Sequence, residues 1–140
     1  ADAFSHIAGY ACYNDGSIRD WQRHTIQFTP GKNFVGTGAF GPFLVTQDEV
    51  GPLPALRLMT RLNGVTVQET VLGDMIFDIP TIIAYCSTFT RLEIGDVIVT
   101  GTPGGVGAKR TPPLWMKAGD VVEVEIDRVG LLRNPIVDEA

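Results

Sequence analysis

Cysteine, basic runs and long apolar segments are scarce in this chain of 140 residues. Its 2 cysteines, Cys12 and Cys86, are too few for a disulfide framework, and both lie in apolar stretches, which favours buried, reduced thiols. The net charge is −5 and no basic run occurs, so the positive surface typical of a nucleic-acid-binding protein is absent. No apolar run approaches the ~20 residues that cross a bilayer, and no signal peptide is visible. We therefore expect a cytoplasmic protein that binds neither nucleic acid nor a membrane.

The apolar content and the length predict a single domain with a sizeable core, since 44% of the residues are hydrophobic. Short strand-like segments recur along the chain, whereas long helical patterns that alternate with strands do not. We predict strands over residues 9–14 and 43–46, the tail of a helix over residues 1–8, and a glycine-rich loop over residues 29–41. The expected fold class is mainly β with a few short helices (α+β).

The clearest local signal is a hairpin centred on Asn63-Gly64. Residues 56–62 alternate in polarity before this pair, and residues 65–69 form a second strand pattern after it. An Asn-Gly pair in this position is typical of a type I′ turn, because both central residues need positive φ. Farther on, apolar residues from Ile79 to Phe89 recur at helical spacing. They predict a helix over residues 80–88 with one buried face and a proline in its first turn.

A short internal repeat connects residues 92–99 with residues 116–123. Each segment carries a Gly-Asp pair followed by β-branched residues, at Gly95-Asp96 and at Gly119-Asp120. We interpret both as the same turn leading into a strand, the first strand covering residues 97–99. The repeat is too short for a solenoid, so we expect both strands in one barrel-like sheet.

Four polar residues near the start of the chain could build a site: Asp15, Arg19, Gln22 and Lys32. Asp15 ends an apolar run and precedes a glycine, so its side chain is expected at the end of a strand. A capping box formed by Ser17 and Asp20 predicts a helix that continues through Gln22. Arg19 and Gln22 lie three residues apart on that helix and would point together toward Asp15.

These residues also have ordinary structural interpretations. Asp15 is a common type of turn residue, Arg19 could pair with a surface acid at little gain, and loop lysines are usually solvated. His6 and His24 are candidate bases, but surface or supporting roles are favoured for both. The glycine-rich segment 100–107 is either a tight structural turn or an anion site lined by backbone amides. Its spacing matches neither a phosphate loop nor a dinucleotide fingerprint.

A family resemblance favours the functional interpretation. The order GY…ND-x-S-x-RD-x-Q…GK-x-F…GPF-x-VT-x-DE…L-x-x-R-x-NG-x-x-x-Q…GD-x-I-x-TGTP-x-GVG…GDVVEVEI extends over most of the sequence, from about Ile7 to Val137. It resembles the fumarylacetoacetate hydrolase family, in particular bacterial members that act on 2-oxo and 2,4-dioxo acids. The resemblance implies a β-rich roll of mixed, barrel-like sheets with peripheral helices, and it implies a homodimer.

The resemblance also implies roles for single residues. Asp15 corresponds to a metal ligand for Mg²⁺ or Mn²⁺, and Lys32 corresponds to a catalytic amine that stabilises enolate charge. Arg19, Gln22 and Thr102 correspond to substrate-binding residues, of which Thr102 would contact carboxylate or keto oxygens. The implied reaction is a metal-dependent hydrolysis of a C–C bond in a small 2,4-dioxo acid, through an enolate.

Part of the family's site has no counterpart in this sequence. The family carries two further carboxylate ligands in an upstream Glu-x-Glu pair, whereas no Glu precedes Glu49 here and the first residue is Ala. One carboxylate is a poor site for a hard divalent ion, which prefers about six oxygen ligands. We therefore expect residues 1–140 to be the C-terminal part of the catalytic domain, active only with its own N-terminal part, which would also supply the general base.

Two alternatives to the hydrolase stay open on the sequence. An isomerase, hydratase or decarboxylase of unsaturated 2-oxo diacids would use the same enolate without the hydrolytic water. A catalytically silent scaffold chain, lacking a complete metal site, is the second alternative.

Overall fold

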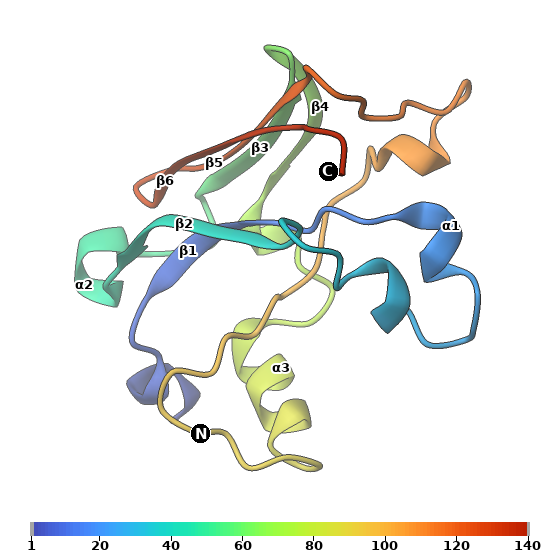
Figure 1. The fold of residues 1–140 in the computed structure, drawn as a ribbon. Coiled ribbons are helices and arrows are strands. Elements are labelled where there is room, and N and C mark those ends of the chain that lie inside the picture. Colours follow the sequence, from blue (N-terminus) through green and yellow to red (C-terminus); the bar gives the residue numbers. More distant parts are fainter. Residues whose placement is uncertain (1, 140) are drawn as a thin grey trace.

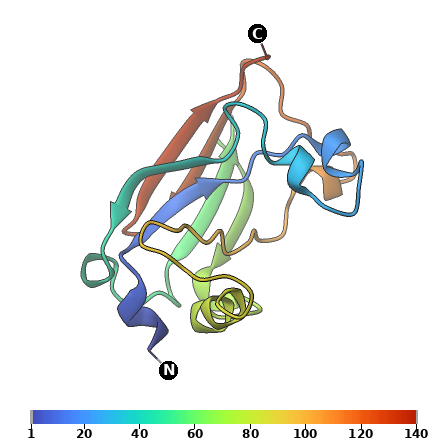
Figure 2. The same cartoon turned by 60° about the horizontal axis from the view of Figure 1, so that its bottom comes forward.

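The computed structural model describes residues 2–139, which form two antiparallel sheets that do not close into a barrel. One sheet pairs β1 (Tyr10–Asn14) with β2 (Ala39–Val45). The other has the strand order β4-β3-β5-β6, with β3 (Arg57–Leu62), β4 (Val65–Val71), β5 (Val121–Ile126) and β6 (Gly130–Pro135). Figures 1 and 2 show the small sheet lying against the larger one, where β1 and β2 contact β6. The mainly β class with short helices is confirmed.

The helices are short and lie in the connections between strands. They are α1 (Arg19–Gln22), α2 (Gln47–Val50) and α3 (Ile79–Cys86), with the 3-10 turns η1 (Ala3–His6), η2 (Thr29–Gly31), η3 (Leu72–Asp74) and η4 (Gly107–Lys109). The side chain of Asp78 caps α3 by accepting the Thr81 N–H at 2.9 Å, and Pro80 lies in the first turn as predicted. Within residues 2–139, no helix is both long and apolar enough to cross a membrane.

The predicted hairpin is present, because Asn63 and Gly64 take φ values of 51° and 80° between β3 and β4. The Asn63 side chain also contacts the next strand: it donates to Asp120 Oδ1 and accepts the Val121 N–H, both at 2.9 Å. The Lys117 N–H donates to the other carboxylate oxygen of Asp120 at 2.9 Å. These hydrogen bonds, the Asn63 one foremost, lower the pKa of Asp120. The hairpin tip and the turn before β5 are thus joined into one unit.

The internal repeat gives two equal turns but only one strand. Asp96 Oδ2 accepts the Glu93 N–H at 2.8 Å, just as Asp120 accepts the Lys117 N–H, and the glycine before each Asp has positive φ, 100° and 91°. The second turn leads into β5, whereas residues 97–99 pair with no strand in the described part of the chain. The predicted strand over residues 97–99 is therefore wrong. A strand needs a neighbour, and Val97 remains 57% exposed.

The core lies where the small sheet meets β5 and β6. Alternate residues Val122 and Val124 of β5 turn inward, toward Cys12 of β1 and Leu132 of β6. The Cys12 thiol donates to the carbonyl of Gly130 at 3.3 Å, and its burial raises its pKa. Cys12 is thus the buried, unpaired thiol that was predicted, and Cys86 is also unpaired but only half-buried.

A large apolar surface remains outside this core. The chain exposes 9675 Å², whereas a compact monomer of 15.2 kDa exposes about 7,100 Å². Several aliphatic side chains lie almost entirely in solvent, among them Ile26, Val35 and Ile94 at 93%, 101% and 108% exposure. Apolar side chains of α3 that were predicted to form a buried face are only half-buried. The described residues thus leave apolar faces available for further contacts.

Candidate functional site

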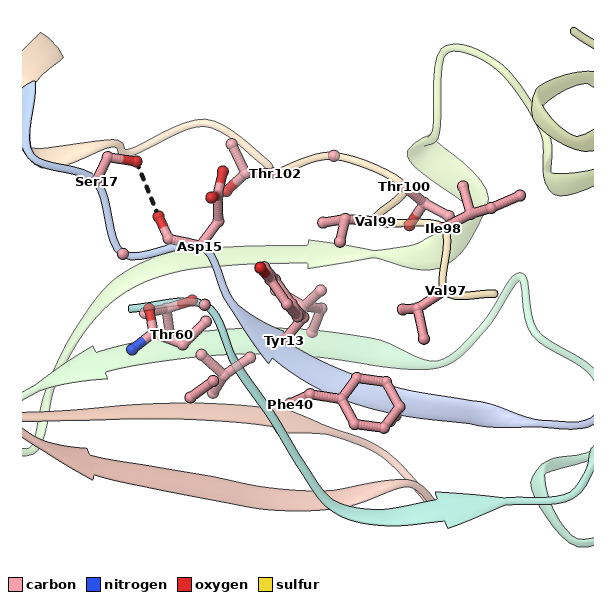
Figure 3. A pocket seen from close by; sticks show the side chains of 18 of the residues that line it. Tyr13, Asp15, Ser17, Phe40, Thr60, Val97, Ile98, Val99, Thr100 and Thr102 are labelled. Atoms are coloured by element: carbon pink, nitrogen blue, oxygen red, sulfur yellow. Dashed lines mark hydrogen bonds between the residues drawn. The ribbon is translucent and has the colours of Figure 1, made fainter. Parts of the chain in front are cut away.

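All five predicted site residues line one open pocket. Figure 3 shows two of them, Asp15 and Thr102, together with Ser17. The pocket has a volume of about 2020 Å³, well above the 300–1,000 Å³ or so of a typical small-molecule site. It is lined by the segment after β1, by residues 36–40 and by the segment 92–109. Its polar lining includes Asp15, Ser17, Arg19, Gln22, Lys32 and Thr102. Because the pocket is so large, these polar residues, and not the whole cavity, are the candidate site.

Asp15 and Lys32 form the polar centre of the site. The Lys32 ammonium contacts Asp15 Oδ2 and donates a second hydrogen bond to Ser17 Oγ at 2.8 Å. Ser17 Oγ in turn donates to the Asp15 backbone carbonyl at 3.1 Å. The side chains of Lys32 and Asp15 are 28% and 40% exposed, so the pair adds little to stability. What it provides is a cation and an anion at fixed positions on the pocket wall.

Close packing of η2 on α1 explains how Lys32 reaches Asp15. The Ile18 N–H donates to the Gly31 carbonyl at 3.0 Å. Gly31 is buried against Gln22, and a Cβ at Gly31 would lie 2.5 Å from Gln22 Cβ. No larger side chain fits there without a shift of the backbone. The glycine before Lys32 therefore allows the contact between the two short helical segments.

Arg19 and Gln22 contact each other on α1. Arg19 Nη1 donates to Gln22 Oε1 at 2.6 Å, and Gln22 is only 6% exposed. The predicted capping box is wrong, because α1 begins at Arg19 and its N-cap, Ile18, makes no side-chain hydrogen bond. The hydroxyl of Ser17 is engaged with Asp15 and Lys32 instead. Its role as a partner of Lys32 was missed, because a serine near a helix start is more often a cap.

Thr102 lies on the glycine-rich segment across the pocket. In Figure 3 the Asp15 side chain extends toward this segment. Gln68 of β4 fixes the segment, since its Nε2 donates to Thr102 Oγ1 at 3.0 Å and to the Pro103 carbonyl at 2.9 Å. Arg110 adds a second attachment by donating to the Gly105 carbonyl at 3.0 Å and to the Val67 carbonyl. Gln68 appeared in the sequence only as the last residue of NG-x-x-x-Q, to which no role was given.

The histidines lie apart from the polar centre. The His24 ring packs against Trp21 with centroids 4.8 Å apart. His6 lies at the end of η1 and lines the pocket. Neither histidine makes a side-chain hydrogen bond to Asp15 or Lys32 in residues 2–139.

The described residues do not form a complete metal site. Over residues 2–139, no three His, Cys, Asp or Glu side chains converge closely enough to bind a metal ion. At the polar centre the carboxylate is that of Asp15, and one of its oxygens contacts an ammonium. These residues alone provide one ligand and a positive charge, which suits binding of an anionic, oxygen-rich molecule.

Comparison with known proteins agrees with the resemblance seen in the sequence motifs. Residues 1–137 match the family model described as fumarylacetoacetate (FAA) hydrolase C-terminal. Oxaloacetate tautomerase fahd2, mitochondrial, of Xenopus laevis is 44% identical over 138 residues, covering 97% of this chain and 43% of that protein. The chain therefore spans less than half the length of this curated relative.

Solved structures show the same fold. A fumarylacetoacetate hydrolase from Exiguobacterium antarcticum superimposes with a TM-score of 0.94 at 38% identity, over 99% of this chain and 50% of that one. Maleylpyruvate hydrolase from Sphingobium sp. SYK-6, in complex with manganese (II) ion and pyruvate, gives 0.82 at 31% identity, over 97% and 46%.

Proposed function

Because the chain belongs to the fumarylacetoacetate hydrolase family, we propose that it contributes to an enzyme acting on a small 2-oxo acid through its enol or enolate form. Proteins similar to this chain are hydrolases, isomerases and tautomerases by name. One observation carries the proposal: the Lys32 ammonium contacts Asp15 and Ser17 in a pocket that also contains the Thr102 hydroxyl.

The chemistry of a 2-oxo acid suits these groups. When a proton leaves the carbon beside the carbonyl, negative charge develops on the carbonyl oxygen. A positioned donor stabilises that charge more in the transition state than in the ground state, which is the condition for catalysis. We assign this role to Lys32. Thr102 would bind the substrate carboxylate, and Arg19 and Gln22 would form the polar wall beside it.

Tautomerisation of a 2-oxo diacid such as oxaloacetate is the outcome that we favour. In this reaction the enol loses its hydroxyl proton and gains one on carbon, so stabilisation of the enolate is the main requirement. The support is the 44% identity to a protein named oxaloacetate tautomerase, against 38% and 31% for the two proteins named hydrolases. Tautomerisation is an isomerisation, so this outcome corresponds to the isomerase alternative that the sequence left open.

Hydrolysis of a 2,4-dioxo acid is the second candidate. Water attacks the distal carbonyl, the adjacent C–C bond breaks, and its electron pair forms the enolate of the 2-oxo acid. The likeness to maleylpyruvate hydrolase, with a TM-score of 0.82, supports it. This reaction needs a base to activate the water, which we expect outside this chain.

A divalent metal, Mg²⁺ or Mn²⁺, is part of the proposal although residues 2–139 hold no complete site for one. Asp15 would be one ligand and further carboxylates would come from outside this chain. When bound, such an ion would withdraw electrons from a chelated 2-oxo acid. A manganese complex of maleylpyruvate hydrolase is consistent with this metal class.

The test is a comparison of two substrates with the full-length protein. Enol-oxaloacetate is followed by its ultraviolet absorbance, and an acylpyruvate is followed by mass spectrometry of its products. Acceleration of enol loss without C–C cleavage supports the tautomerase. Release of pyruvate from the acylpyruvate supports the hydrolase, and inertness toward both overturns the proposal.

A further inference from the structure

We propose that Gln68 is a positioning residue that orients the Thr102 hydroxyl as a hydrogen-bond donor to the anionic substrate. The inference rests on the proposed function, in which Thr102 binds the carboxylate of a 2-oxo acid. It concerns a residue of β4 that lies 34 positions before Thr102 in the sequence.

The orientation of the Gln68 amide follows from its two partners. Nε2 lies 3.0 Å from Thr102 Oγ1 and 2.9 Å from the Pro103 carbonyl oxygen. A carbonyl oxygen only accepts hydrogen bonds, so a flipped amide would place two acceptors against each other. The nitrogen therefore faces the loop and uses both of its hydrogens there.

This arrangement determines the direction of the Thr102 hydroxyl. Its oxygen already accepts a hydrogen from Gln68, so its own hydrogen points elsewhere. Among the described residues, no acceptor takes that hydrogen, and Thr102 is exposed to the pocket. A hydroxyl whose hydrogen is left free in this way can donate it to an anion.

The backbone around Thr102 is also fixed against β4, so the direction of the hydroxyl is defined relative to the pocket. Gly105 has a φ of 97°, and a Cβ there would lie 2.3 Å from the Val67 carbonyl oxygen. Arg110 donates to the carbonyls of both Gly105 and Val67. Strand β4 thus sets the position of the loop, and Gln68 sets the direction of its hydroxyl.

A double-mutant cycle on the full-length protein tests the inference, with pyruvate as the probe and calorimetry as the measurement. Gln68→Met keeps the side-chain length and removes the amide, while Thr102→Val keeps the shape and removes the hydroxyl. Each single substitution should weaken pyruvate binding by about tenfold to a hundredfold, the loss of one hydrogen bond to a charged group. The double variant should bind about as weakly as Thr102→Val alone, because Gln68 acts through the hydroxyl.

The control is Gln47→Met, since Gln47 is an exposed glutamine on α2 with no side-chain hydrogen bond in residues 2–139. It should leave pyruvate affinity unchanged. The inference would be overturned if Gln68→Met weakened pyruvate binding equally in the wild type and in Thr102→Val. Equal losses would show that Gln68 acts on the loop and not through the hydroxyl. Unchanged affinity in Gln68→Met would overturn it as well.

Neutron diffraction separates this inference from the proposed function. A Thr102 hydrogen directed away from Gln68 supports the orientation without reference to any substrate, and a hydrogen directed at Gln68 overturns it. If the orientation is observed but the wild-type protein binds no 2-oxo acid, the proposed function fails. The orientation of the hydroxyl by Gln68 then stands, and its role toward a substrate does not.

Discussion

The ammonium of Lys32 contacts the carboxylate of Asp15 although the two residues are 17 positions apart in sequence. Three local features produce this contact. β1 ends just before Asp15, the backbone of Ile18 bonds to Gly31, and Gly31 packs on Gln22 without a side chain. The contact is thus a result of how two short helical segments pack, and it places a cation on the wall of the pocket.

The proposed role of Asp15 as a metal ligand predicts how substitutions change the binding of divalent metals. Asp15→Ala in the full-length protein should abolish Mg²⁺ or Mn²⁺ binding, because a carboxylate ligand is lost, whereas Asp20→Ala on the exposed side of α1 should leave it intact. Calorimetry measures both. The 140-residue chain alone should bind Mg²⁺ feebly, since one carboxylate cannot replace the hydration of the ion. Unchanged affinity in Asp15→Ala, or tight binding by the chain alone, would contradict this assignment.

The pair formed by Arg19 and Gln22 predicts a loss of stability. Arg19→Met removes the donor to the Oε1 of Gln22, which is 6% exposed, and a buried acceptor without a partner costs about 1–3 kcal/mol. Arg23→Met is the matched control, because Arg23 is exposed and makes no side-chain hydrogen bond in the described part of the chain. Denaturant unfolding should show the loss only for Arg19→Met. Equal effects of the two substitutions would show that the hydrogen bond is unimportant.

Substitution of Tyr10, in contrast, should not lower the free energy of unfolding. Its hydroxyl is buried and has no hydrogen-bond partner among residues 2–139, and burial raises the pKa of Tyr10. Tyr10→Phe should therefore be neutral or stabilising by up to about 1–2 kcal/mol, since a desolvated polar group is removed. Tyr85→Phe, at a site that is 69% exposed, should change nothing. A clear loss of stability in Tyr10→Phe would reveal a partner for the hydroxyl.

The turn at Asp120 predicts a dependence of stability on pH. The pKa of Asp120 is lowered in the folded chain, so its contribution is present above the unfolded pKa of about 3.9 and is lost as the pH falls through the lower folded pKa. Asn63→Ala removes the main cause of this shift and should cost about 1–3 kcal/mol at neutral pH. Its unfolding free energy should also fall less steeply below about pH 4.

Thr66→Ala provides the control for Asn63→Ala. Thr66 lies on β4 close to the same hairpin tip, is exposed, and makes no side-chain hydrogen bond among the described residues. It should change the unfolding free energy by less than about 0.5 kcal/mol. A parallel acid profile for Asn63→Ala and the wild type would contradict the account of Asp120.

Local chemistry made some elements predictable from sequence. Asn63-Gly64 specifies its own turn, because few other residue pairs tolerate positive φ at both positions. Pro80 and the capping Asp78 likewise define the start of α3. The repeated Gly-Asp turns were also correct, at Gly95-Asp96 as well as before β5.

Features that depend on distant partners were not predictable in this way. Residues 97–99 have the composition of a strand, but strand formation requires a neighbour that the described residues do not provide. Ser17 was interpreted as a helix cap because its true partner, Lys32, lies 15 residues away. The site residues were found through the family motifs, and the contact of Gln68 with Thr102 required the structure.

Kinetics of Lys32→Met with enol-oxaloacetate test the central claim most directly. If Lys32 stabilises enolate charge, the substitution should lower kcat and kcat/KM together by about 10²–10³-fold, since the interaction is made in the transition state. Metal affinity should not fall, because the substitution removes a cation from the Asp15 carboxylate. Lys117→Met, at an exposed lysine whose ammonium makes no side-chain hydrogen bond in residues 2–139, should retain full activity. An unchanged kcat in Lys32→Met, or activity restored by excess Mg²⁺, would contradict the claim.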